Sequence, residues 1–199
     1  YVLIDDRVPV ALRNPLSSDL AVMRADMYGS VLTVVAHNLN RRVDSVAVYE
    51  LGYTYSKGNG ATPFNESLHL SLALSGDAPA SGWEGKPRPY DFFDLKGDLE
   101  SLLESIHVEW SLKLIAHRPL ANEESFAIMA GEKHLGEIGR VDSKTCAMFD
   151  IRNPVWVGVL AVDALVASAS EDVPQYAELP RFPAAYRDLA VLVDAATPV

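Results

Sequence analysis

The stretch that decides the fold is residues 13–52, RNPLSSDLAVMRADMYGSVLTVVAHNLNRRVDSVAVYELG. Its middle part, residues 25–42, predicts a helix, because four apolar side chains recur at intervals of four: Met27, Val31, Val35 and Leu39. Asp26 adds a negative charge in the first turn, where the helix dipole favours it. A strand is expected at residues 46–55. The fold therefore starts with a helix that leads into a strand, and the helix needs a flat apolar surface to pack on.

A second helix is predicted at residues 95–106, with Asp94 as its N-cap. Its apolar positions follow the spacing of one helical face: Leu95, Leu99, Leu102, Leu103 and Ile106. The surface that both helices need is a sheet. From residue 68 to residue 74 leucines alternate with smaller or polar residues, which is the period of a strand with one buried face, and residues 108–114 repeat that pattern.

Further strands are predicted at residues 125–130, 135–141 and 155–164. The turn at residues 130–132 joins two of them as an antiparallel hairpin. Two stretches rich in Gly, Pro and small polar residues, 56–63 and 76–89, are expected to be loops. The predicted class is α+β, an antiparallel β-sheet with helices packed on one face.

The order of these segments resembles a known family. The stretch 13–52 contains Asn-Pro-Leu-Ser leading to Met-Arg, a helix ending in Asn-Leu-Asn-Arg and a strand ending in Tyr-Glu-Leu-Gly. Two later segments agree, DFFDLKGDLESLL at residues 91–103 and PRFPAAYRDLAVLV at residues 180–193. Together they resemble the central synthetase-like core of the β subunit of bacterial phenylalanyl-tRNA synthetase, across nearly the whole chain.

The resemblance implies a class II aminoacyl-tRNA synthetase-like core and a place in a cytoplasmic α2β2 ligase. That ligase attaches phenylalanine to its tRNA with ATP and magnesium. It also implies that the α subunit carries the aminoacylation site, while this segment is a non-catalytic scaffold that pairs with α and supports tRNA binding. The isolated chain is expected to be inactive and to hold no cofactor.

The resemblance further places the subunit interface at residues 13–42. The interface residues expected there are Arg13, Asn14, Arg24, Tyr28 and Leu32. Tyr28 and Leu32 are expected to form an exposed patch beside the buried face of the helix. Without the α subunit, such a patch is expected to favour a homodimer.

The domain prediction places the synthetase-like core at residues 1–170. Residues 171–199 are expected to be a linker followed by the truncated first strand of a ferredoxin-like anticodon-binding domain, with the break at 168–174. Residues 186–194 are apolar on both faces, as in an inner strand, and are expected to pair with the sheet edge or with a second copy. Together with the start at Tyr1, this indicates a piece of a longer protein.

The sequence offers no catalytic, cofactor or metal residue that we would assign. The five histidines lack the spacing of a zinc motif, and there is neither a P-loop nor a G-x-S-x-G elbow. Cys146 has only Lys144 as a nearby cation, which disfavours a thiolate nucleophile. Arg140 is followed by Val141 and Asp142 rather than by the arrangement of a class II nucleotide site.

Charge and hydropathy limit the function classes. The formal net charge of −10 argues against nucleic-acid binding by this segment alone, and no apolar run is long enough for a membrane span. Two rival readings are a stand-alone ligand-binding or regulatory paralogue and an independent enzyme. A stable complex with an α subunit would separate the first interpretation from these rivals.

Overall fold

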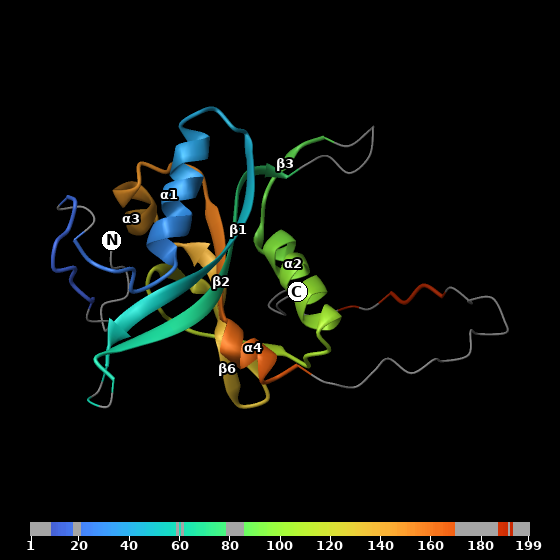
Figure 1. Cartoon of the computed structure of the whole chain (residues 1–199). Helices are drawn as coiled ribbons and strands as arrows, with labels where there is room; N and C mark the ends of the chain where they lie inside the picture. The colour runs from blue at the N-terminus through green and yellow to red at the C-terminus, as the bar shows by residue number, and fades with distance from the viewer. Residues whose placement is uncertain are drawn as a thin grey trace.

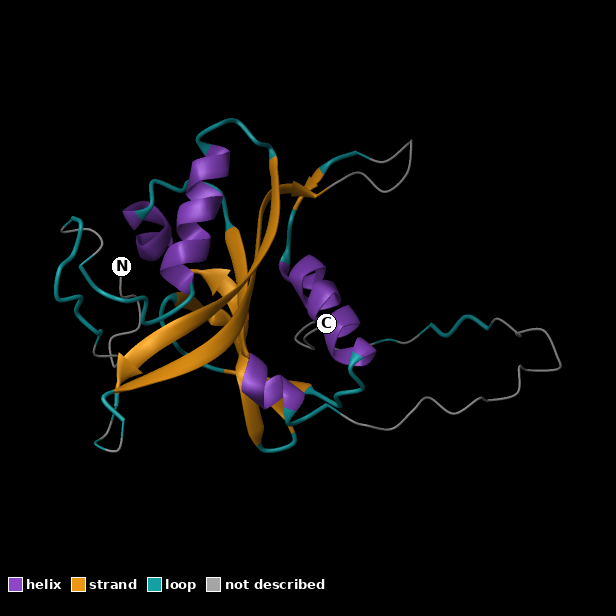
Figure 2. Cartoon of the chain, viewed as in Figure 1, coloured by secondary structure: helices purple, strands orange, loops and turns teal. Residues whose placement is uncertain are grey.

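The computed structural model describes residues 9–17, 21–58, 60, 62–78, 86–169, 187–190 and 192. The helices of this described part are α1 (Tyr28–Leu39), α2 (Phe92–Ser105), α3 (Ser143–Met148) and α4 (Val162–Val166). Its strands are β1 (Ser45–Lys57), β2 (Phe64–Ala78), β3 (Arg88–Pro89), β4 (Ser111–Leu114), β5 (Leu120–Ala130), β6 (Lys133–Val141) and β7 (Val155–Ala161). Figure 1 labels most of these elements, and Figure 2 separates helices from strands.

All strand pairs are antiparallel, and the sheet has the order β1-β2-β7-β6-β5-β4, with the short β3 pairing to β2. The β1–β2 and β5–β6 hairpins are formed by strands adjacent in sequence. The predicted turn between β5 and β6 is confirmed, and Gly131 there has a φ of 58°, which glycine adopts without strain. The α+β class and the antiparallel sheet flanked by helices are as expected.

Helices cover both faces of the sheet, so the expectation of one covered face is wrong. On one face, α1 packs Val31 and Val35 into a core with Ala73 and Val157. On the other face, α2 packs its leucines, including Leu99, into a second core with strand residues of β2, β6 and β7. Figure 1 shows α1 and α2 on opposite sides of the sheet.

The reason lies in the composition of β2. The leucines of residues 68–74 do face one side, where Leu74 is buried under α2. The intervening Ser71 and Ala73 are both completely buried on the other side, since small side chains let α1 approach the backbone closely. The hydroxyls of Ser71 and Ser75 donate hydrogen bonds to the carbonyl oxygens of Glu50 and Pro154, so their burial leaves no polar group unsatisfied.

The N-terminus of α2 lies three residues before the predicted one. Asp91 is the N-cap and accepts hydrogen bonds from the backbone N–H groups of Phe93 and Asp94. Asp94 closes the capping box by accepting from the N–H of Asp91. A hydrogen bond from the Arg88 guanidinium holds the pKa of the Asp94 carboxyl below its ordinary value. The predicted N-cap, Asp94, is therefore the N3 residue of the box.

Other boundaries also differ from the sequence-based expectation. α1 ends at Leu39 and begins at Tyr28, so it is shorter than residues 25–42. The strand predicted at 108–114 begins only at Ser111, and the one predicted at 155–164 ends at Ala161, after which the chain enters α4. β1 extends to Lys57 and β2 extends to Ala78, so each strand enters the first residues of an expected loop, 56–63 or 76–89, and the loops are shorter than predicted.

The C-terminal expectations fall mainly on residues that lie outside the described part of the chain. The proposed break at 168–174 is described only as far as residue 169. Of the strand expected at 186–194, residues 187–190 and 192 are described, and these are in irregular structure with Leu189 and Leu192 exposed. The domain boundary and the pairing of this segment stay predictions.

Candidate functional site

The outer face of β1 carries large apolar side chains that nothing in the described part of the chain covers. Tyr49, Leu51 and Tyr53 alternate along the strand and are 76%, 59% and 48% exposed. Phe64 on β2 pairs with Lys57 in the same register, lies on the same face and is 52% exposed. These four residues are named here the β1 patch. Isolated exposed apolar residues are ordinary, but a contiguous row of them is typical of an interaction site.

β1 is also an edge strand, and part of its outer edge is open. Residues before α1 bind its far end: the Tyr55 N–H donates to the carbonyl oxygen of Arg24 at 2.8 Å, and Arg24 Nε donates to the carbonyl oxygen of Tyr53 at 3.0 Å. Among the described residues, no backbone hydrogen bond reaches the outward amide groups of Tyr49 and Leu51. Unpaired strand edges of this kind pair readily with another chain.

Arg24 connects the segment before α1 to β1 through its side chain. Its guanidinium forms an ion pair with Glu50 and donates to the Ser30 hydroxyl at 3.0 Å, in addition to the contact with Tyr53. The side chain is only 30% exposed. These contacts tie the two halves of the helix–strand unit together next to the β1 patch.

Arg13 and Asn14, two further residues expected at the interface, are exposed. They follow a short antiparallel pairing in which Leu12 N–H donates to the Ala21 carbonyl and Met23 N–H donates to the Val10 carbonyl. Arg13 and Asn14 come directly after the first half of this pairing, and its second half leads into Arg24.

Tyr28 and Leu32 are 2% and 0% exposed, so the expectation that they form a surface patch is wrong. The buried face of α1 is wider than the four-residue row used to predict it, because Tyr28, Val31, Leu32 and Val35 follow the i, i+3, i+4, i+7 spacing of a full face. The outward face of α1 has one large apolar side chain, Val34, which is 41% exposed. The exposed apolar surface therefore lies on β1 instead of α1.

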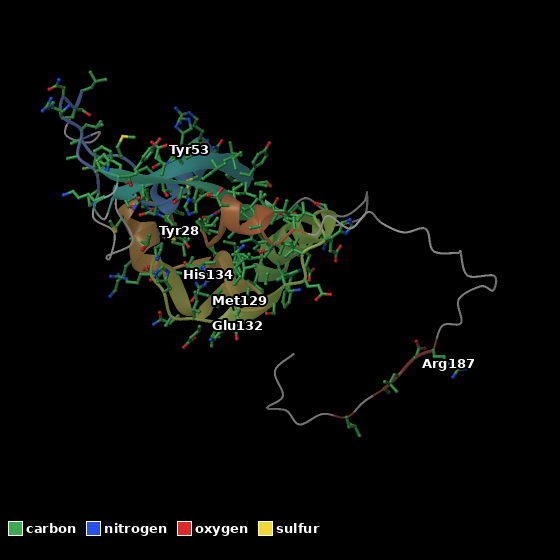
Figure 3. All side chains as sticks on the ribbon, turned by 60° about the horizontal axis from the view of Figure 1, so that its bottom comes forward. Tyr28, Tyr53, Met129, Glu132, His134 and Arg187 are labelled. Carbon is green, nitrogen blue, oxygen red and sulfur yellow. The ribbon has the colours of Figure 1, made fainter. Side chains whose placement is uncertain are left out.

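A polar cavity of about 340 Å³ lies beside the start of α1. In it Glu137 Oε2 accepts a hydrogen bond from the Tyr28 hydroxyl at 3.2 Å and lies 2.8 Å from His117 Nδ1. His134 Nε2 lies 3.9 Å from the other carboxylate oxygen. Figure 3 shows Tyr53 on the β1–β2 side of the molecule, with Tyr28 and His134 toward the β5–β6 hairpin that Glu132 marks.

The remaining chemically reactive group is Cys146. It is buried in the core under α1, and this burial, with the nearby Asp142 carboxylate, raises the pKa of its thiol to about 11 against the opposing effect of Arg140. At neutral pH the side chain is a neutral thiol that packs as a small apolar group. In the described part of the chain, no group of three or more His, Cys, Asp or Glu has an arrangement that could hold a metal ion.

The comparisons with known proteins decide the family. The profile of the phenylalanyl tRNA synthetase beta chain CLM domain matches residues 3–162. The chain belongs to this CLM domain family. The phenylalanine–tRNA ligase beta subunit of Salinibacter ruber is 35% identical over 210 residues, which cover 98% of this chain and 25% of the relative. The one from Anaeromyxobacter dehalogenans is 36% identical and covers 93% of this chain and 24% of the relative. The chain thus spans about a quarter of the length of these relatives.

The CLM domain also shares its fold with solved synthetase structures. Pyrrolysyl-tRNA synthetase from Desulfitobacterium hafniense superposes with a TM-score of 0.58 at 16% identity, over 79% of this chain and 52% of that one. A second structure of that enzyme gives a TM-score of 0.55. At this identity the likeness shows the fold alone, which is the class II synthetase-like core expected from the sequence.

Sequence reasoning found the helix–strand unit of the CLM domain and missed its exposed side. The signal was present in VAVYELGYTYSK, residues 46–57, where aromatic and aliphatic residues alternate with Glu50, Gly52 and Thr54. The cavity had no such signal, because His117 and Glu137 come from separate parts of the chain. In the structure none of the helices of the described CLM domain is long and apolar enough to cross a membrane.

Proposed function

We propose that this CLM domain is part of the β subunit of a cytoplasmic phenylalanine–tRNA ligase, in which it is a non-catalytic scaffold for the α subunit. The full complex would attach phenylalanine to its tRNA with ATP and Mg²⁺. The named relatives support the family of the complex, and the β1 patch beside an open strand edge is the observation that carries the scaffold role. Because the net charge is −10, we assign most phosphate contacts with the tRNA to other parts of the complex.

The β1 patch has the composition of a protein-binding surface. Three of its four side chains are aromatic, and aromatic residues are enriched at the cores of interfaces because they bury much area at a low entropic cost. The open backbone groups of Tyr49 and Leu51 would add directional hydrogen bonds if a partner strand extended the sheet. An α subunit with a matching apolar face fits both features.

The scaffold role is also favoured by the lack of free cations around the cavity. Adenylate formation needs positive groups aimed at the phosphates. Of the described residues, those that line the cavity include neither Lys nor Arg. Arg24, Arg88 and Arg140 are held by Glu50, Asp94 and Glu124, respectively.

We expect the isolated chain to give no phenylalanine-dependent exchange of pyrophosphate into ATP. The physical reason is that two carboxylates, Asp26 and Glu137, line the cavity where a triphosphate would need cations. The measurement is exchange of labelled pyrophosphate, with the complete α2β2 ligase as the positive control. Exchange by the chain alone that is saturable in phenylalanine would contradict the non-catalytic assignment.

A second expectation concerns complex formation. The substitution Leu51→Asp should reduce copurification with a coexpressed α subunit by about tenfold or more, because it buries a charge in the centre of the proposed interface. The matched control is Leu114→Asp on β4, the opposite edge strand of the same sheet. Leu51 and Leu114 are 59% and 61% exposed, so the two changes cost a similar amount in the free chain.

Circular dichroism checks that both variants keep the fold. If Leu51→Asp and Leu114→Asp affect copurification equally, or if neither affects it, the β1 patch is not the α-subunit interface. Sedimentation of the chain without α tests the expected homodimer with the same pair of variants. A dimer that dissociates only with Leu51→Asp would use the β1 patch.

A further inference from the structure

The polar cavity beside α1 is built by residues from distant parts of the chain. Tyr28 lies at the first residue of α1, Thr54 on β1, His69 on β2 and Glu137 on β6, and His117 comes from the loop before β5. Its volume of about 340 Å³ falls in the range of small-molecule sites. The cavity belongs to the face of the sheet opposite the β1 patch, since Thr54 and Tyr53 alternate along β1.

Glu137 is oriented by two neighbours that contact its Oε2, and its Oε1 can still accept a hydrogen bond. The Tyr28 hydroxyl and His117 Nδ1 both contact Oε2, which fixes the direction of the carboxylate. Oε1 lies 3.9 Å from His134 Nε2, which is beyond hydrogen-bonding distance. The side chain is 18% exposed, so a donor that enters the cavity reaches this oxygen in a partly desolvated setting. Charge-assisted hydrogen bonds are strongest in such a setting.

The charge of the cavity selects the kind of donor. Asp26, 3% exposed, adds a second carboxylate to the lining, and its Oδ1 accepts from the N–H of Gly29 at 3.3 Å. The described lining holds three histidines, His69, His117 and His134, but neither Lys nor Arg, so a phosphate or carboxylate ligand would meet two carboxylates and no permanently charged cation. A cation is favoured, and the absence of a metal-binding group among the described residues leaves an organic ammonium ion as the cation.

The rest of the lining is apolar. Met27 and Val159 line the cavity with apolar side chains against which a hydrocarbon or aromatic body can pack. We propose that this cavity binds a small amphiphilic amine, with its ammonium group at Glu137 Oε1 and its apolar body against Met27 and Val159. This site is separate from the β1 patch and does not depend on the α subunit.

Tryptamine is a suitable probe, because it joins an ammonium group to a flat apolar ring. The matched probe is indole-3-propionate, which has the same ring and a carboxylate. We expect tryptamine to bind saturably to the 199-residue chain, measured by calorimetry and by NMR shifts at Glu137 and Val159. Indole-3-propionate is expected to bind at least about tenfold more weakly, because the cavity repels its charge.

Variants locate the binding site. Glu137→Gln should weaken tryptamine binding about tenfold, because it replaces a charged acceptor by a neutral one of the same shape. Glu124→Gln is the control, since Glu124 pairs with Arg140 and does not line the cavity. Ala161→Leu fills the cavity without changing either carboxylate and should abolish binding by occupying the space, so the test does not depend on the folding of one variant.

Three results would overturn the proposal. These are equal affinity for the two indole probes, unchanged tryptamine affinity in both Glu137→Gln and Ala161→Leu, and tryptamine shifts that do not saturate. The same measurements with an α subunit present separate the two proposals. If Leu51→Asp loses the complex but still binds tryptamine, the result agrees with both the proposed α-subunit interface and the proposed amine site.

Discussion

Replacing Gly136 by alanine is expected to destabilise the protein by about 4 kcal/mol, at the upper end of single-residue effects. A Cβ atom at this position would lie 2.1 Å from the carbonyl oxygen of Val159 and 2.7 Å from the Cα of Leu160. Both are backbone atoms of β7, which pairs with β6 in the middle of the sheet. No rotamer change relieves the overlap, so β6 and β7 must separate.

The matched control is Gly97→Ala in α2, where an added Cβ meets nothing within 4 Å. That change should stabilise the protein by about 1 kcal/mol, because alanine loses less backbone entropy than glycine in a helix. Urea denaturation of the two variants gives both values. If the free energy of unfolding of Gly136→Ala were within about 1 kcal/mol of that of the original chain, β6 and β7 would not lie as close together as the structure places them.

The second large effect is expected from Leu99→Ala. Leu99 is completely buried between α2 and the sheet, so its removal leaves a cavity as well as losing apolar burial. The expected loss is about 3 kcal/mol. Ser101→Ala on the exposed side of the same helix is the control and should change stability by less than about 0.5 kcal/mol.

Thermal and urea unfolding followed by circular dichroism measure both changes. If Leu99→Ala were as mild as Ser101→Ala, the face of the sheet under α2 would not be a core, and only the face under α1 would be. Equal losses for Leu99→Ala and a matching truncation of Val35 would instead support two cores of similar weight.

The sequence predicted the elements whose periodicity is long and regular. α1, α2, β1 and the β5–β6 hairpin were found because their apolar residues repeat over several turns or several residue pairs. α3 was missed because six residues hold less than two turns of any pattern. Its local signal was Asp142, an N-cap that accepts from the N–H groups of Lys144 and Thr145.

What the sequence could not predict depends on contacts between distant segments. Ser71 is a polar residue in a strand pattern, and only the nearby carbonyl of Glu50 explains its complete burial. Tyr28 was expected at the surface because it lies outside the four-residue apolar row of α1, and its hydroxyl partner, Glu137, comes from the distant strand β6. The Arg24–Glu50 ion pair is likewise invisible until α1 and β1 are placed side by side.

The position of β7 has a consequence for how the chain acquires its structure during synthesis. β2 pairs through residues 69–75 with residues 155–161, so the centre of the sheet joins segments that leave the ribosome far apart in time. The β1–β2 hairpin can form early, yet the other hydrogen-bonding edge of β2 remains without its partner strand until β7 emerges. Delayed closure of such a long loop slows folding. A nascent chain halted before residue 155 would expose an incomplete sheet with an unpaired strand edge, which is prone to aggregation and is the kind of surface that chaperones bind.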